Sequence, residues 1–133
     1  TCGLDHWLVG VRPIGGAGPA NRLEARWAAA DANPYLVLAG VLGAGLDGLD
    51  SDYDLMPQVE GDPHADARWE RLPVDISGAI DNFDSPFTRE VFGDVFVDNF
   101  TFMQRREAAE FEEHAEPSDD ITEWELRRYR AVM

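Results

Sequence analysis

Apolar and polar positions alternate in two short segments near the N-terminus, 8–12 and 22–27. A period of two predicts β-strands, because successive side chains of a strand point to opposite faces. On the second segment the charged side chains share one face, and these are Arg22, Glu24 and Arg26. The residues between the two segments, 13–20, are rich in Gly and Pro and predict a connecting loop. A strand with one charged face indicates a polar cleft on that side.

From Asn33 onward the pattern changes to a helical one. Asn33 is a favourable helix N-cap and Pro34 suits the first helical position, so a helix is predicted from Pro34 to about Leu49. This helix contains glycines at 40, 43 and 45, which lower helix propensity and favour close approach of another backbone. Residues 50–71 are acidic, contain prolines and predict a long irregular loop.

The rest of the chain is predicted to be helical. One helix carries apolar residues at 76, 80 and 83, a short one opens at Ser85–Pro86, and a longer one reaches about Glu113. A break is expected at 116–120, and the capping box Thr122–Glu125 starts a final helix that ends in three arginines, Arg127, Arg128 and Arg130. Their position complements the helix dipole. The predicted fold class is therefore α/β (α+β), with strands first and a mostly helical C-terminal region after them.

Length and hydropathy favour one domain without a membrane span. The chain has 133 residues, of which 44% are hydrophobic. The longest apolar run, 34–46, is shorter than the roughly 20 residues that cross a bilayer. The N-terminus shows no targeting pattern, and its first residue, Thr1, leaves open whether the chain is a fragment or a complete product.

The charge balance is strongly acidic. The net charge is −15, and all 11 basic residues are arginines. A protein of this charge repels phosphate backbones, so nucleic acid is not an expected partner. The acid excess is typical of solubility in a salty cytoplasm, and the lone cysteine, Cys2, fits a reducing compartment. We expect a cytoplasmic protein.

The charged face of the second strand is the strongest candidate for a functional site in this sequence. With Arg12 on the first strand, it brings three guanidinium groups around the carboxylate of Glu24. One interpretation is an exposed sheet edge with a ladder of ion pairs. The other is a site for a polyanion, where arginines hold phosphate or carboxylate oxygens and Glu24 helps to hold a divalent cation. Spacing alone leaves both open.

Two linked motifs resemble the signature of the glutamine synthetase family. The first is Asn-Arg-Leu-Glu-Ala-Arg at 21–26, and the second is Ala-Asp-Ala-Asn-Pro-Tyr-Leu at 30–36, followed by a helix that ends Ala-Gly-Leu-Asp-Gly at 44–48. Leu-Pro at 72–73 and Thr-Glu-Trp-Glu-Leu at 122–126 resemble later family segments. The resemblance covers nearly the whole chain and identifies residues 1–133 as a C-terminal segment of a glutamine synthetase-like catalytic domain.

The resemblance implies roles for four residues. Glu24 matches a metal-binding glutamate, Arg26 an arginine that contacts the substrate glutamate, and Arg12 and Arg22 arginines that face the ATP phosphates. The implied activity is ATP-dependent amide ligation through a γ-glutamyl phosphate, with ammonia or an amine as nitrogen donor and Mg²⁺ or Mn²⁺ as metal. The implied substrates are small molecules, glutamate or an analogue among them, and the full-length protein is expected to form a homo-oligomer.

Two departures from the family pattern qualify this interpretation. Trp7 stands five residues before Arg12, where the family has a phosphate-contacting arginine. The family's other metal-binding residues lie upstream of this segment, so the chain alone is expected to be inactive. The alternative is a non-catalytic or remnant family member that binds nucleotide or other subunits.

Other candidates have structural interpretations. His64 and His114 lack partners at metal-ligand spacing. His6 could contact a phosphate or nucleotide, but it is expected to be a solvent-exposed residue before a strand. The glycine-rich stretch 15–18 lacks the Lys and helix of a phosphate-binding loop and predicts a turn.

Overall fold

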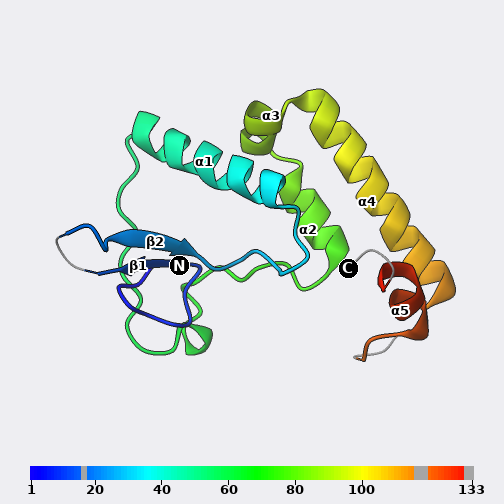
Figure 1. Cartoon of the computed structure of the whole chain (residues 1–133), viewed down its shortest axis with the longest axis horizontal. Coiled ribbons are helices and arrows are strands. Elements are labelled where there is room, and N and C mark those ends of the chain that lie inside the picture. Colours follow the sequence, from blue (N-terminus) through cyan, green and yellow to red (C-terminus); the bar gives the residue numbers. More distant parts are fainter. Residues whose placement is uncertain (16–17, 116–119, 131–133) are drawn as a thin grey trace. The chain divides into compact units, whose positions relative to one another are not determined.

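The computed structural model describes residues 1–15, 18–115 and 120–130 (Figure 1). The chain divides into two compact units, Thr1–Arg71 and Leu72–Met133. Within the described residues, the first unit contains the strands and one long helix, and the second contains four helices. Strands followed by a mostly helical region were predicted, and this fold class is confirmed.

The sheet of the first unit has two antiparallel strands, β1 (Val11–Ile14) and β2 (Arg22–Ala25). Arg12 lies directly opposite Glu24 in the register. Both strands exist as predicted, but β1 begins three residues later than expected. The reason is that the residues before it form a turn and a bend, although the Gly10 carbonyl still accepts the Arg26 N–H at 2.9 Å.

The N-terminal segment and the long loop are tied to each other beside β1. Cys2 forms a parallel bridge with Val11, and the Cys2 carbonyl accepts the N–H of Val59 at 2.8 Å. Val9 and Val59 are two of the few buried apolar residues of this unit. The loop over 51–71 is irregular as predicted, apart from the 3₁₀ turn η1 (Pro63–Ala65).

Helix α1 (Pro34–Asp50) starts where its cap predicts, because the Asn33 side chain accepts the Tyr35 N–H at 3.0 Å. None of its residues is buried, and leucines 38, 42 and 46 are each more than half exposed. The expectation of a backbone packed closely at the glycines is wrong at Gly45, where an added Cβ would meet no atom within 4 Å. An exposed helix face leaves that space open.

The second unit is built on the longest helix, α4 (Asp94–His114), against which α2 (Ile76–Phe83), α3 (Pro86–Phe92) and α5 (Glu123–Tyr129) pack. Its core contains Val97, which is fully buried, and an aromatic cluster of Phe83, Phe92, Phe96 and Phe100, with ring centroids 5.0–5.8 Å apart. Apolar residues at helical spacing predicted α2 and α4, and capping residues predicted α3 and α5; the structure confirms all four.

Capping residues set the starts of the short helices. Ser85 and Thr88 form a capping box at α3, and Thr122 and Glu125 form the predicted one at α5. Most of the predicted break at 116–120 lies outside the described residues. No helix in the described ranges is long and apolar enough to cross a membrane.

Candidate functional site on the charged strands

The two strands bring three of the predicted site residues together. Arg12 and Glu24 are cross-strand partners, with Arg12 Nη1 3.6 Å from Glu24 Oε2. Arg26, two residues after Glu24, donates a hydrogen bond from Nη1 to Glu24 Oε1. We call Arg12, Glu24 and Arg26 the charged strand cluster. Two guanidinium groups therefore converge on one carboxylate.

Arg12 is the most enclosed member of the cluster, with a side chain only 13% exposed. A second carboxylate, that of Asp5, lies 4.0 Å from its Nη2. Its Nε is buried and has no hydrogen-bond partner among the described residues. Burial of a guanidinium is costly without compensation, so the residues around Arg12 must supply favourable interactions.

Trp7 supplies one of them. The Arg12 Cζ lies over the indole ring, 4.2 Å from its centroid, and the Arg26 Cζ is 5.6 Å from the same ring. Both distances fall within the range of cation–π attraction. The sequence predicted that Trp7 takes the position of a family arginine, but not that its ring contacts two arginines. Only the folded turn before β1 reveals this contact.

That turn fixes the backbone on both sides of Trp7. The Leu8 N–H donates to His6 Nδ1 at 3.2 Å, and His6 Nε2 lies 2.7 Å from the Gly61 carbonyl. The tautomer with hydrogen on Nε2 satisfies both contacts. His6 is therefore half-buried and structural, rather than a solvent-exposed residue as expected.

Arg22 stands apart from the cluster. It lies opposite Ile14 in the register, and its Nη1 donates to the Ala20 carbonyl at 3.3 Å. It is exposed. The structure thus places Arg22 on the same strand as Glu24 and Arg26 without bringing its guanidinium to the shared carboxylate.

Glu24 is the carboxylate predicted to bind a metal. Both of its oxygens face arginines, and the described part of the chain contains no group of three or more His, Cys, Asp or Glu that could hold a metal ion. Mg²⁺ prefers about six oxygen ligands, most of them water or phosphate. Glu24 fits such a site only as one contributor, with the other ligands coming from outside these residues.

The C-terminal arginines have structural partners beyond the helix dipole. Arg128 donates from Nε and Nη2 to both oxygens of Glu107, at 2.8 and 2.7 Å, and the Tyr129 hydroxyl donates to Glu107 at 2.8 Å. These hydrogen bonds, that of Arg128 first, lower the pKa of Glu107 to about 2. Burial and the contact with Glu107 raise the pKa of Tyr129 to about 12. These contacts hold α5 against α4.

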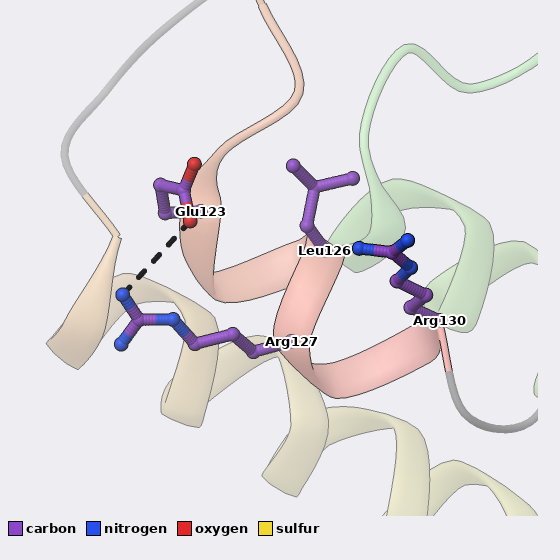
Figure 2. A pocket seen from close by; sticks show the side chains of 4 residues that line it. All are labelled: Glu123, Leu126, Arg127 and Arg130. Atoms are coloured by element: carbon purple, nitrogen blue, oxygen red, sulfur yellow. Dashed lines mark ion pairs between the residues drawn. The ribbon is translucent and has the colours of Figure 1, made fainter.

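A pocket lies on α5 itself, lined by Glu123, Leu126, Arg127 and Arg130 (Figure 2). Its one ion pair is weak, because Arg127 Nη2 is 3.9 Å from Glu123 Oε2 and both side chains are largely exposed. None of its lining residues belongs to the charged strand cluster. The pocket therefore adds no group to the predicted site.

Comparison with known proteins places the chain in a family. The family model of the glutamine synthetase catalytic domain matches residues 5–129. A match over nearly the whole chain shows that this chain belongs to the glutamine synthetase family.

Individual relatives include ligases with different nitrogen donors in their names. The chain is 36% identical to a gamma-glutamylanilide synthase of an Acinetobacter species over 127 residues, 90% of this chain and 25% of that protein. It is 35% identical to a glutamine synthetase of Thermococcus kodakarensis over 92% of this chain and 30% of that protein. It is 30% identical to a glutamate–isopropylamine ligase of a Pseudomonas species over 98% of this chain and 28% of that protein.

The chain thus spans between a quarter and a third of the length of these relatives. The matches define the family of this segment, and the activity of a whole protein is a separate question.

Proposed function

We propose that this chain forms one wall of the active site of an ATP-dependent amide ligase of the glutamine synthetase family, with residues 1–133 as the C-terminal part of its catalytic domain. The observation that carries this proposal is the register of β1 and β2, which brings Arg12 and Arg26 to the same carboxylate, Glu24, within a segment matched by the family model.

In this proposal the arginines bind the anionic groups of the substrates. Arg12 and Arg22 hold ATP phosphate oxygens, and Arg26 holds the glutamate side chain. Guanidinium groups suit this role because their planar N–H donors match phosphate and carboxylate oxygens in pairs. Arg22, which has no ion-pair partner among the described residues, is free to turn toward a phosphate.

Glu24 contributes one oxygen ligand to a Mg²⁺ or Mn²⁺ ion beside the phosphates. Such an ion, when bound, neutralises charge on the transferred phosphoryl group. Glu24 has one oxygen 3.6 Å from Arg12, a looser contact than a hydrogen bond, and this oxygen is the one available to a cation. The remaining ligands come from other polypeptide, together with phosphate and water.

The proposed reaction has two steps. A glutamate γ-carboxylate oxygen attacks the terminal phosphorus of ATP, the bond to ADP breaks, and an acyl phosphate forms. The nitrogen lone pair of ammonia or an amine then attacks the carbonyl carbon, inorganic phosphate leaves, and the nitrogen loses a proton. Fixed cations lower both barriers because negative charge is redistributed over phosphate oxygens in each step.

The nitrogen donor lies within the class of ammonia and small amines. Relatives that match this chain are named glutamine synthetase, gamma-glutamylanilide synthase, gamma-glutamylethanolamide synthetase and glutamate–isopropylamine ligase. We place the protein in the cytoplasm, in nitrogen metabolism, as a homo-oligomer when full length.

The test is phosphate release from ATP by the full-length protein, with glutamate and either ammonia, aniline, ethanolamine or isopropylamine. We expect release that requires both glutamate and one of these nitrogen donors. An Arg26→Ala variant should lower its rate about 10²- to 10³-fold. Arg68→Ala is the matched control, since Arg68 pairs with Asp66 in the same unit.

The alternative is a non-catalytic family member that binds nucleotide or other subunits. Trp7 favours it, because the ring replaces a charge that the family uses on phosphate. Absence of phosphate release with every donor, together with retained ATP binding in calorimetry, would establish this alternative.

A further inference from the structure

Trp7 contacts the charged strand cluster, but the proposed reaction gives it no role. Its ring contacts both Arg12 and Arg26, as does the carboxylate of Glu24. The ring is nevertheless 68% exposed, so it does not serve to fill a core. A side chain that meets both guanidinium groups from the surface points to a role in the arrangement of these groups.

Electrostatics explains why such a residue is needed. Arg12 and Arg26 both attract the carboxylate of Glu24, and this attraction outweighs their mutual repulsion, but the repulsion weakens the hold of the carboxylate on each arginine. The face of an indole ring carries negative potential and attracts both cations without adding a charge. A cationic residue at position 7, such as the arginine that the family has there, would instead add to the repulsion until an anion is bound.

The geometry also leaves the hydrogen-bond donors available. The five N–H groups of a guanidinium lie in its plane, whereas a stacked ring covers its face. The indole over Arg12 therefore leaves Nη1 and Nη2 directed at Glu24, Asp5 or an incoming anion. It also lies against an arginine whose Nε is buried without a hydrogen bond among the described residues.

We propose that Trp7 is a positioning residue, whose indole ring stacks on the guanidinium groups of Arg12 and Arg26 and holds them in the orientation that receives a polyphosphate or acyl phosphate. The identity of the ligand in this inference rests on the proposed function. The contacts of the Trp7 ring with the two arginines do not, since they are present without a ligand. The turn held by His6 fixes the ring in advance, so the two arginines are ordered before a ligand arrives.

The first experiment needs no ligand. Arginine Nε–H resonances of the 133-residue chain are recorded by NMR, because an indole ring shifts the protons above it upfield. We expect upfield-shifted resonances for Arg12 and Arg26, a reduced shift in Trp7→Phe and none in Trp7→Leu. Trp69→Leu is the matched control. The Arg68 Cζ lies 5.6 Å from the centroid of the Trp69 ring in the same unit, so this variant should shift the Arg68 resonance alone.

Each variant is first checked for its unfolding midpoint. If Trp7→Leu does not fold, Trp7→Phe tests the inference instead. A smaller ring in the same place must give a smaller upfield shift of the Arg12 and Arg26 resonances. Arg12 and Arg26 resonances that are unchanged in a folded Trp7→Leu or Trp7→Phe variant would overturn the inference.

The second experiment is a calorimetric titration with pyrophosphate. We expect Trp7→Leu to raise the Kd about 2- to 30-fold, the range of exposed to desolvated cation–π contacts, and Trp7→Phe to raise it less. Trp69→Leu should leave the Kd unchanged. An unchanged Kd in Trp7→Leu contradicts the inference. If the unaltered chain does not bind pyrophosphate although its arginine shifts depend on Trp7, the proposed phosphate role fails and the stacking role of Trp7 stands.

Discussion

The two units of this chain use arginine in opposite ways. In the first unit, Arg12 and Arg26 converge on the carboxylate of Glu24, and a second carboxylate, that of Asp5, lies 4.0 Å from Arg12. In the second, Arg89 alone is surrounded by three carboxylates, with Nε, Nη1 and Nη2 donating to Asp84, Asp94 and Asp98 at 2.8, 3.1 and 2.9 Å.

The surroundings of these arginines distinguish an ion cluster that stabilises the fold from one that can bind a ligand. Arg89 on α3 ties together the end of α2 and the start of α4, each of its three nitrogens donates to a carboxylate, and the contacts raise its pKa, that with Asp84 most. Three carboxylates around one guanidinium do not attract a further anion. In the first unit, two guanidinium groups share the carboxylate of Glu24, so N–H donors remain for an anionic ligand.

The largest effect is expected in the charged strand cluster. Arg26→Ala in the full-length protein should lower the rate of ATP-dependent amide formation about 10²- to 10³-fold, the cost of removing one fixed donor from a charge-stabilising site. The measurement is steady-state phosphate release. Arg68→Ala should leave the rate within about twofold, and an equal loss in both variants would contradict a special role for the strand cluster.

Arg89→Met should act on stability instead. Without the guanidinium, Asp84, Asp94 and Asp98 face one another unpaired, so the free energy of unfolding falls. Urea denaturation checks this, with Arg106→Met as control, because Arg106 pairs with one carboxylate, that of Glu110. We expect the midpoint to fall further for Arg89→Met, and equal midpoints would show that the three-carboxylate cluster is not structural.

Glu107 makes the stability of the second unit depend on pH. Its pKa is about 2 in the folded chain, below the ordinary 4.5, so its ionised form stabilises the fold above about pH 4.5 and this contribution is lost as the pH falls toward 2. Glu107→Gln should lower the free energy of unfolding by about 1 kcal/mol at pH 7.

The measurement for Glu107 is urea denaturation at several pH values. The difference from the unaltered chain should shrink between pH 4.5 and 2. Glu112→Gln, at an exposed position of the same helix, should show no such dependence. A constant difference across this pH range would exclude ionisation of Glu107 as the cause.

The smallest effect concerns Tyr129. Its pKa of about 12 lies above the ordinary 10, so the neutral phenol stabilises the fold, and this contribution is lost as the pH rises from 10 toward 12. Tyr129→Phe removes the donor to Glu107 and should lower the free energy of unfolding by about 0.5 kcal/mol at pH 7. Ultraviolet titration should show one fewer late-ionising phenol in this variant.

Signals that depend on neighbouring residues predicted the structure well. Asn33 with Pro34 gave the start of α1, and Thr122 with Glu125 gave the start of α5, because a cap is a contact between residues two or three positions apart. The prediction of where β1 starts was less accurate. Alternation continues into residues 8–10, but the turn that carries Trp7 occupies them in the fold.

The candidate site was predicted in part. Arg12, Glu24 and Arg26 lie together because antiparallel pairing joins them, and alternation along each strand already put them on one face. Arg22 lies on that face as well, yet its side chain turns to a local carbonyl. The roles of these four residues on ATP, glutamate and metal remain predictions.

The sequence by itself determined the family, the class of fold and the charged face of β2, because motifs, caps and alternation are all local patterns. Only the tertiary structure decided that the Trp7 ring contacts two arginines, that His6 holds its turn to Gly61, and that Arg128 binds Glu107. These last two contacts join residues 55 and 21 positions apart. Such pairings follow from how the chain closes on itself, which no periodicity along the sequence encodes.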